Sequence, residues 1–512
     1  MFIYALLFLL IAFLYYHLHH KRRGLPPGPR PLPFFGNLLE VAKDPPGEAV
    51  YARWAKEYGP VYTYWLGELP LIAVTDYEMI MDTFHKDAEA YAGRWSFPEF
   101  DFMVRGGPFG VIFTEGESWK EQRRFALQFL RDFGLGKNMM QERIIDEIAM
   151  LFIQIEEEFA TGQEEHDLYN HVDLAIGSII NGLLFSYGFH GRKKQQFYDL
   201  KARVQKHIAS NGHPLTLMSM KSPNFYKKLP VFKEQIQISV DTGRYLLSFF
   251  RDRVREAEAE FDEDQPPQDY VHAFLGEWKR RDRTGEKHFF SEEQLLSMCY
   301  DLWVAGQETT SNTLGWCWSY LIHHPEIQAK AHEELDRVIG SDRIITTNDR
   351  ANLPYCNALI NEVLRISNLI PQNGWHKTTK DVVINGFNIP KGTAIVPQIS
   401  VVLSSDKIYP DAKKFDPSRF LDENGKLKRA DELIAFSIGK RFVYPLDCSN
   451  RDVCRQCLGM SMALMELFLF ITNILNRYRL LPGKQKPNLT RRFGLTVNPD
   501  HFTCRMEKRT HH

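Results

Sequence analysis

The chain begins with an almost uninterrupted apolar stretch, MFIYALLFLLIAFLYYHL, and the basic run HHKRR follows at once. Eighteen helical residues, at about 1.5 Å each, nearly span a hydrocarbon core of about 30 Å. A cleaved signal peptide normally has its positive charges before the apolar stretch, whereas here they follow it. The pattern predicts an uncleaved membrane anchor over residues 1–20, with a buried N-terminal helix as the alternative. By the positive-inside rule, the rest of the chain is expected to face the cytoplasm.

A basic and proline-rich segment, residues 21–37, comes next. Its part GLPPGPRPLPFFGN has five prolines in fourteen residues. Because proline fixes φ and removes a backbone donor, we expect a stiff, extended hinge between the membrane and a globular body.

The body has no internal repeat and no second proline- or glycine-rich break, so we expect one domain over residues 38–512. Apolar residues recur at helical spacing through most of it, most clearly over residues 116–133, 291–324, 357–366 and 459–478. Strand-like patches are few, at residues 61–67, 69–76 and 381–398, the last with a hairpin signal at Asn385-Gly386. The pattern predicts a mainly α fold with a small β region.

The longest predicted helix, residues 291–324, has a polar interruption at its middle. Ser291 is expected to be its N-cap, with Gln294 at the capping-box position. The middle reads AGQETTSN, and threonine hydroxyls there can bond the carbonyl four residues earlier and loosen the helix. The segment fits either a core helix with satisfied hydroxyls or a place where a ligand approaches the backbone near Gly306.

Composition and charge exclude some classes of function. The chain is 44% hydrophobic and 25% charged, and its formal net charge of −1 gives no reason to expect a nucleic-acid partner. Seven cysteines, of which only three are clustered, argue against a disulfide scaffold and for a reducing compartment.

Two pairs of side chains share a helical face. Glu362 and Arg365, in NEVLR, are three residues apart, and arginine can bind a carboxylate bidentately; Arg419, in FDPSRF, is a further guanidinium. Trp119 and Arg123, in ESWKEQRR, place an indole N–H and a guanidinium one turn apart, which suits a carboxylate on a ligand. Each pair alone is also common on protein surfaces.

Taken together and in order, the anchor, the proline hinge, W-x-x-x-R, A-G-x-E-T-T, E-x-x-R, F-x-P-x-R-F and G-K-R…C-L-G resemble the cytochrome P-450 haem-thiolate monooxygenases. The likeness covers essentially the whole chain and is greatest to the membrane-anchored microsomal enzymes of animals. It implies a cytochrome P-450-type single haem domain behind the anchor, with haem b bound through an axial cysteine thiolate.

The resemblance also implies roles for residues of the long helix. Glu308 and Thr309 would deliver protons to oxygen, and Ala305 and Gly306 would leave room for dioxygen.

Outside that helix, the resemblance implies a buried structural triad of Glu362, Arg365 and Arg419. The residues implied to bind the haem carboxylates are Trp119, Arg123, Arg94, His376 and Arg441. The matching residues of the cysteine loop are Phe436, Gly439 and Gly459.

The cysteine loop of the family reads F-x-x-G-x-R-x-C-x-G, and this chain matches it in two separate pieces. The first half matches at Phe436, Gly439 and Arg441, but Val443 stands at the cysteine position.

The second half of the pattern recurs as Gln456-Cys457-Leu458-Gly459, directly before the predicted helix 459–478. A helix N-terminus stabilises a thiolate, so Cys457 is the predicted iron ligand. A zinc site built from Cys448, Cys454 and Cys457 would lack a fourth ligand.

Residues 442–455 are then a fourteen-residue insertion, and deleting them gives FSIGKRQCLG, a complete match. Codons for Arg441-Phe442 can contain GT and codons for Cys454-Arg455 can contain AG. We therefore interpret the segment as a short retained intron, with a genuine loop as the alternative. The chain as written is expected to bind haem poorly, because the surroundings of the thiolate are interrupted.

The implied reaction is insertion of one atom of O₂ into a small apolar substrate, of the fatty acid, steroid or xenobiotic class. Electrons would come from NADPH through a membrane-bound flavoprotein reductase, with a cytochrome b-type protein as a further donor, at the endoplasmic reticulum membrane. One alternative is a haem-binding-impaired or inactive paralogue, if the insertion is real. Another is an enzyme that isomerises peroxides without a reductase, against which the Glu308-Thr309 pair argues.

Two loops are expected around the substrate. Phe109 and Val111 are candidate pocket walls, and the apolar and basic segment 219–232 is expected to dip into the membrane near a substrate entrance.

Overall fold

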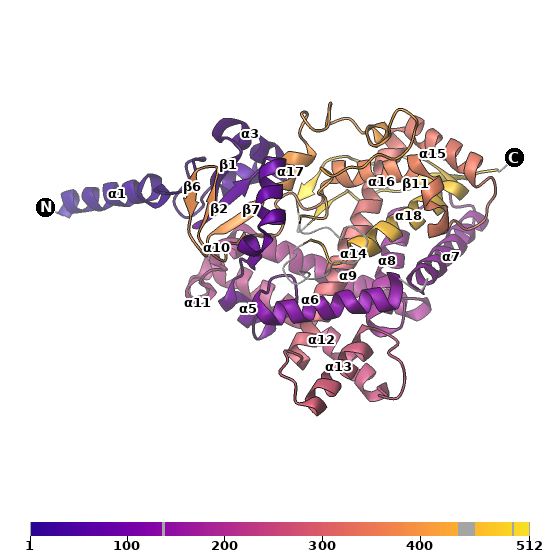
Figure 1. Cartoon of the computed structure of the whole chain (residues 1–512), viewed down its shortest axis with the longest axis horizontal. Helices are drawn as coiled ribbons and strands as arrows, with labels where there is room; N and C mark the ends of the chain where they lie inside the picture. The colour runs from indigo at the N-terminus through magenta and orange to yellow at the C-terminus, as the bar shows by residue number, and fades with distance from the viewer. Residues whose placement is uncertain (1, 136–138, 439–455, 494–495, 511–512) are drawn as a thin grey trace.

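The computed structural model describes residues 2–135, 139–438, 456–493 and 496–510. Most of them are helical, with a small sheet region at the α1 end of the body, as the hydrophobic pattern predicts (Figure 1). The α-helices are α1 (Phe2–Leu18), α2 (Leu38–Ala42), α3 (Glu48–Tyr58), α4 (Tyr77–Ile80), α5 (Pro98–Arg105), α6 (Gly116–Leu130), α7 (Met139–Ala160), α8 (Leu168–Phe185), α9 (Lys194–Gly212), α10 (Pro214–Ser219), α11 (Pro223–Tyr226), α12 (Pro230–Glu260), α13 (Tyr270–Thr284), α14 (Glu292–His323), α15 (Pro325–Val338), α16 (Pro354–Ser367), α17 (Ile399–Leu403) and α18 (Met460–Arg477). The strands are β1 (Val61–Leu66), β2 (Leu69–Val74), β3 (Gly93–Arg94), β4 (His376–Lys377), β5 (Val382–Ile384), β6 (Phe387–Ile389), β7 (Ala394–Pro397), β8 (Tyr478–Pro482), β9 (Arg492–Phe493), β10 (Val497–Asn498) and β11 (Cys504–Lys508).

The largest sheet has five strands in the order β1-β2-β7-β4-β3. β1 pairs antiparallel with β2, which pairs parallel with β7. The pairing of β3 with β4 sets Arg94 directly opposite His376. The predicted hairpin is also present, because β5 and β6 pair antiparallel. Asn385 and Gly386 between them have φ of 49° and 80°, the left-handed conformations of a two-residue type I′ turn.

α14 is the central helix, and it packs against α8, α12, α16 and α18. Its bounds agree with the predicted helix 291–324 to within one residue at each end. Ser291 caps it as predicted, since its side chain accepts from the backbone N–H of Gln294 (3.2 Å). The predicted capping box is wrong, however. The amide of Gln294 bonds both the N–H (3.1 Å) and the carbonyl (3.2 Å) of Gly110 instead.

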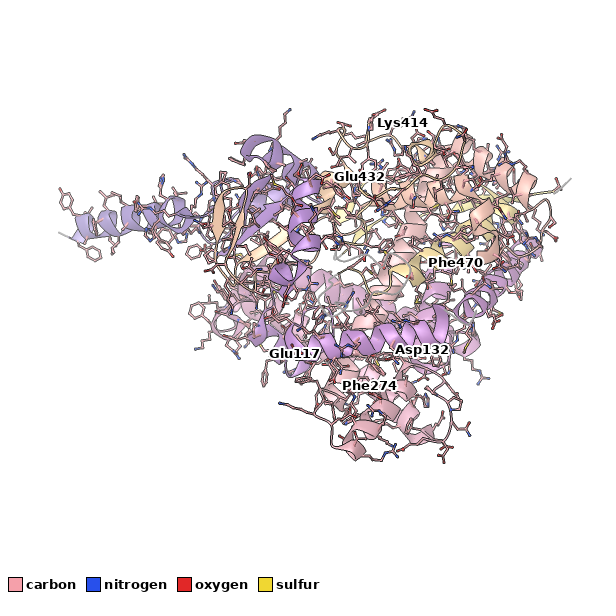
Figure 2. All side chains as sticks on the ribbon, viewed as in Figure 1. Glu117, Asp132, Phe274, Lys414, Glu432 and Phe470 are labelled. Carbon is pink, nitrogen blue, oxygen red and sulfur yellow. The ribbon has the colours of Figure 1, made fainter. Side chains whose placement is uncertain are left out.

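The main hydrophobic core surrounds α14. Trp303, Trp316 and Trp318 of this helix have no exposed surface, because neighbouring helices enclose most of α14. α18 supplies the facing apolar residues, and Phe470, labelled in Figure 2, lies inside the body with the rest of that helix. A helix that is buried over most of its surface carries apolar residues on most of its faces. Its few polar residues therefore require partners.

α1 projects from the body at the end where β1, β2 and β6 lie (Figure 1). Residues Phe2–Arg22 are long and apolar enough to cross a membrane, by length and composition. Only 6% of the span is buried in the protein, so its apolar side chains face outward. An apolar helix without a protein partner suits a lipid environment.

The proline-rich hinge lies against the body and is not a free spacer. The backbone N–H of Thr63 in β1 donates to the carbonyl of Pro27 (2.8 Å). A Cβ on Gly28 would lie 1.9 Å from the carbonyl oxygen of Thr63, so only glycine allows this approach. Lys21 also pairs with Glu68 in the turn between β1 and β2 (3.1 Å). The C-terminal end of α1 is thereby held to the small sheet.

Candidate functional site

The structure brings the three residues of the predicted triad together. Glu362 of α16 has no exposed surface, and its two oxygens accept from Nε (2.7 Å) and an NH₂ group (2.8 Å) of Arg365 in bidentate geometry. Nε of Arg419 donates to the same carboxylate (3.2 Å), as does the backbone N–H of Asp416 (2.9 Å). One buried carboxylate therefore binds two guanidinium groups.

The remaining donors of both arginines bind backbone carbonyls. Arg365 donates to Leu403 (2.9 Å), at the end of α17, and to Lys414 (3.4 Å). Arg419 donates to Pro410 (3.0 Å) and also to Lys414 (3.2 Å). Lys414, labelled at the top of Figure 2, lies on an outer loop. The triad thus fastens α16 to α17 and to this loop, and its chemistry is structural.

One face of α14 is accessible at the predicted polar middle. Ala305 is exposed and Thr309 is half-buried, and the hydroxyl of Thr309 donates to the carbonyl of Ala305 (2.8 Å). Gly306 has a different environment from the one expected. A Cβ there would lie 2.9 Å from Cδ1 of Ile180, so the room that this glycine leaves is used by α8. Ala305 and Thr309 therefore form the accessible face.

Glu308 points away from that face. It is buried and its Oε2 accepts from the ammonium of Lys201 in α9 (2.8 Å). Its other oxygen accepts from the amide of Asn312 (3.2 Å). The predicted acid–alcohol pair is present in the chain, but the two side chains bond to different groups.

Cys457 lies directly before α18, as the sequence predicts. Its side chain is solvent-accessible, although protein atoms surround it closely enough for burial to raise the pKa of its thiol. The backbone N–H groups of Gly459 and Met460 and the charge of Arg123 act in the opposite direction. The other described cysteines are all buried: Cys299, Cys317, Cys356 and Cys504. Among the described residues, the sulfur of Cys457 is thus the accessible one.

The described parts of the two halves of the cysteine motif lie side by side, although the insertion separates them in sequence. The backbone N–H of Cys457 donates to the carbonyl of Phe436 (3.1 Å), although these residues are far apart in sequence. Gly439, Arg441 and the insertion 442–455 lie outside the described residues. Gly459 is the N-cap of α18, and a Cβ there would contact nothing within 4 Å.

Cationic and polar donors gather near the cysteine. Trp119 and Arg123 of α6 are neighbours, with the guanidinium 5.9 Å from the indole ring, and Arg123 donates to the carbonyl of Gln456 (2.5 Å). Burial, and then the positive charge of Arg123, lower the pKa of Arg94 to about 10, against the effect of Glu115. Two guanidinium groups close enough to disfavour each other favour an anion nearby.

His376 is held by its surroundings. It is buried, its Nδ1–H donates to the carbonyl of Tyr91 (2.7 Å), and its ring lies edge-on to Phe84. Its register opposite Arg94 brings it to the same edge of the sheet.

These residues fit the haem that the resemblance implies. Two guanidinium groups, an indole and an imidazole suit a pair of carboxylates. The Nε of Arg94 is buried and has no hydrogen-bond partner among the described residues, so it is a donor suited to such a group. An accessible thiol beside helix N–H groups suits iron, since coordination removes its proton.

Sequence reasoning missed the group that holds the loop before α6. Asp301 of α14 is fully buried, pairs with Arg105 (2.8 Å), and accepts from the N–H groups of Val111 (2.7 Å) and Ile112 (3.0 Å). Of the two predicted pocket walls, Val111 is buried in the core and Phe109 is half-buried. The signal was available, because Asp301 is a lone charge in an apolar run of α14.

The sequence of the chain is similar to those of known proteins over most of its length. The family model "Cytochrome P450" matches residues 26–506. Rabbit (Oryctolagus cuniculus) "Cytochrome P450 2C16" is 34% identical over 90% of this chain and 88% of its own length. Human "Cytochrome P450 2C8" is 34% identical over 92% of this chain and 90% of its own length, and mouse (Mus musculus) "Cytochrome P450 2C44" is 35% identical over 89% and 87%. The chain belongs to the cytochrome P450 family.

Proposed function

We propose that Cys457 supplies the thiolate ligand of a haem at which this protein inserts one oxygen atom into an apolar substrate. Family membership makes the protein a haem b monooxygenase. The assignment to individual residues is ours. The observation that carries it is the accessible sulfur of Cys457 beside the N–H groups that open α18.

Trp119, Arg123, Arg94 and His376 are the described residues that would hold the haem carboxylates, with Arg441 as a fifth. When bound, the haem supplies the activation of dioxygen and the one-electron chemistry. The protein positions that chemistry. The donors fix the orientation of the ring, and the N–H groups beside the sulfur favour its charged form.

Proton delivery is the second task of the chain. The Thr309 hydroxyl lies on the accessible face of α14 and is oriented by the Ala305 carbonyl (2.8 Å). Glu308 is the nearest acidic residue along the helix. Its side chain would have to change rotamer before it could pass a proton to Thr309. Asp301 fixes the loop of Val111 to α14, because its carboxylate accepts from the backbone N–H of Val111 (2.7 Å).

Redox partners and membrane placement complete the proposal. The relatives and the apolar helix α1 indicate anchoring at the endoplasmic reticulum membrane. We assign the catalytic body to the cytoplasmic side, with electrons from NADPH through a flavoprotein reductase and a cytochrome b-type protein as a further donor. The segment from α11 to the start of α12 is suited to contact with the membrane. Its apolar side chains Phe225, Leu229 and Val231 are exposed, and the basic Lys227 lies beside them.

Labelled dioxygen tests this function. The full chain, in phospholipid vesicles with a microsomal flavoprotein reductase and NADPH, is given a medium-chain fatty acid, a steroid and an apolar aromatic ether. We expect at least one product with a single labelled oxygen atom. The Thr309→Ala protein should still consume NADPH, but the electrons should form hydrogen peroxide and not product, because the proton path is lost. Turnover that proceeds equally well without NADPH and reductase would contradict the proposal.

A further inference from the structure

A buried polar cluster holds Glu308 from the side opposite the accessible face of α14. The ammonium of Lys201 in α9 donates to Oε2 of Glu308 (2.8 Å), to Oδ1 of Asp173 in α8 (3.1 Å) and to Oε1 of Gln307 (2.9 Å). Gln307 in turn donates to Asp173 (2.5 Å). The three protons of the ammonium are thus all used, and none of these residues is more than 6% exposed.

The charges in this cluster are unequal. Two carboxylates face one ammonium, and burial makes an unbalanced charge costly. Burial opposes the charge on Lys201, but Asp173 and Glu308 raise the pKa of Lys201 above its ordinary value overall. Burial, with a further contribution from Glu308, raises the pKa of Asp173. Lys201 therefore remains charged, and the two carboxylates compete for it.

The remaining neighbours do not add a second cation among the described residues. Asn312 donates to Oε1 of Glu308 (3.2 Å) and accepts from the hydroxyl of Tyr169 in α8 (2.7 Å). Burial raises the pKa of Tyr169 well above its ordinary value, so this phenol stays neutral. The charge balance of Glu308 thus depends on Lys201.

We propose that Lys201 is a positioning residue for proton delivery, which keeps Glu308 turned towards α8 and α9, away from Thr309. This inference rests on the proposed role of Glu308 as a proton donor. It makes the position of α9 part of the proton path, because Glu308 can turn towards Thr309 only when its bond to Lys201 is released. Asp173 shares the ammonium and so limits how tightly Glu308 is held.

The pairing itself is tested without turnover, by denaturant unfolding of the full chain from about pH 5 to pH 8. In Lys201→Met a buried carboxyl must take up a proton that the unfolded chain releases. Stability relative to wild type should then fall as pH rises, by about tenfold in the unfolding equilibrium constant per pH unit. Lys201→Arg keeps the charge and should show no added slope.

A double variant tests whether Glu308 is one of the carboxyls that Lys201 balances. Lys201→Met with Glu308→Gln should lose the added slope, because Asp173 is then the one carboxyl of the described cluster without a cation, and the wild type, with two carboxylates and one ammonium, also has one carboxyl in excess. A slope that persists in this double variant, or that is absent from Lys201→Met, overturns the proposal.

Asp173→Asn gives an independent test, should Lys201→Met fail to fold. Lys201 then has Glu308 as its only carboxylate within this cluster and holds it more tightly. We expect a loss of product per NADPH and a gain of peroxide, with no further loss when Glu308→Gln is added. Product per NADPH at the wild-type value in Asp173→Asn overturns the proposal. If Glu308→Gln alone leaves product per NADPH unchanged, the proposed role of Glu308 as a proton donor is wrong. The pH slope still reports separately whether Lys201 pairs with Glu308.

Discussion

The buried triad offers a prediction whose magnitude follows from its geometry. Glu362→Gln keeps the shape of the side chain but removes the negative charge that Arg365 and Arg419 share. The carboxylate receives four hydrogen bonds and has no exposed surface. In the variant an amide N–H₂ group would face a guanidinium, and a buried positive charge would lose its partner.

Breaking a buried ion pair from one side costs about 3–5 kcal/mol. Arg365 can still donate hydrogen bonds to the carbonyls of Leu403 and Lys414 in the variant. The expected loss of unfolding free energy is therefore towards the lower end of that range. Arg343→Gln is the matched control. Arg343 also binds a carboxylate bidentately, that of Asp349 (2.7 and 3.0 Å), but its side chain is 47% exposed. Exposed pairs contribute about 0–1 kcal/mol.

Denaturant unfolding of the full chain, followed by tryptophan fluorescence and by far-ultraviolet circular dichroism, measures both variants. The midpoint should fall much further in Glu362→Gln than in Arg343→Gln, with an unchanged slope. Equal midpoints for the two variants would refute the view that the triad stabilises the fold through its buried charge.

Two further predictions concern a buried carboxyl and the insertion. Burial raises the pKa of Glu466 in α18 from 4.5 to about 8, against the hydrogen bond from Thr310 (3.0 Å). Its contribution to stability is therefore present below about pH 4.5 and is lost as pH rises towards 8. Glu466→Gln should flatten that part of the pH–stability curve in denaturant unfolding, and an unchanged curve would contradict the burial argument. Deleting residues 442–455 should raise the amount of haem bound per protein chain, because the surroundings of Cys457 become continuous. This amount is measured after reconstitution with haem. Equal haem content in the two chains would show that the insertion is harmless.

Local patterns predicted much of this fold. The apolar spacing and Ser291 located α14 to within one residue, and Asn385-Gly386 located the β5–β6 hairpin. The pairing of Glu362 with Arg365 followed from their i, i+3 spacing, since residues on one helical face must be neighbours. In each case the partners lie close together in sequence.

Partners on different elements were not predictable in the same way. Gln294 bonds Gly110 in place of closing its own cap, and Lys201 reaches Glu308 from another helix. Such contacts depend on how helices pack, which the spacing of one sequence does not encode. Gly306 is a similar case, because its missing side chain makes room for Ile180 of α8.

Substitution of Cys457 by serine tests whether this sulfur binds the haem iron. Cys457→Ser is made in the chain that lacks residues 442–455, and its reduced, carbon-monoxide-treated absorbance spectrum is compared with that of the shortened parent. The parent should show the band of a thiolate-ligated haem, and the serine variant should lose it. An unaltered band in the serine variant would show that a group other than Cys457 is the iron ligand.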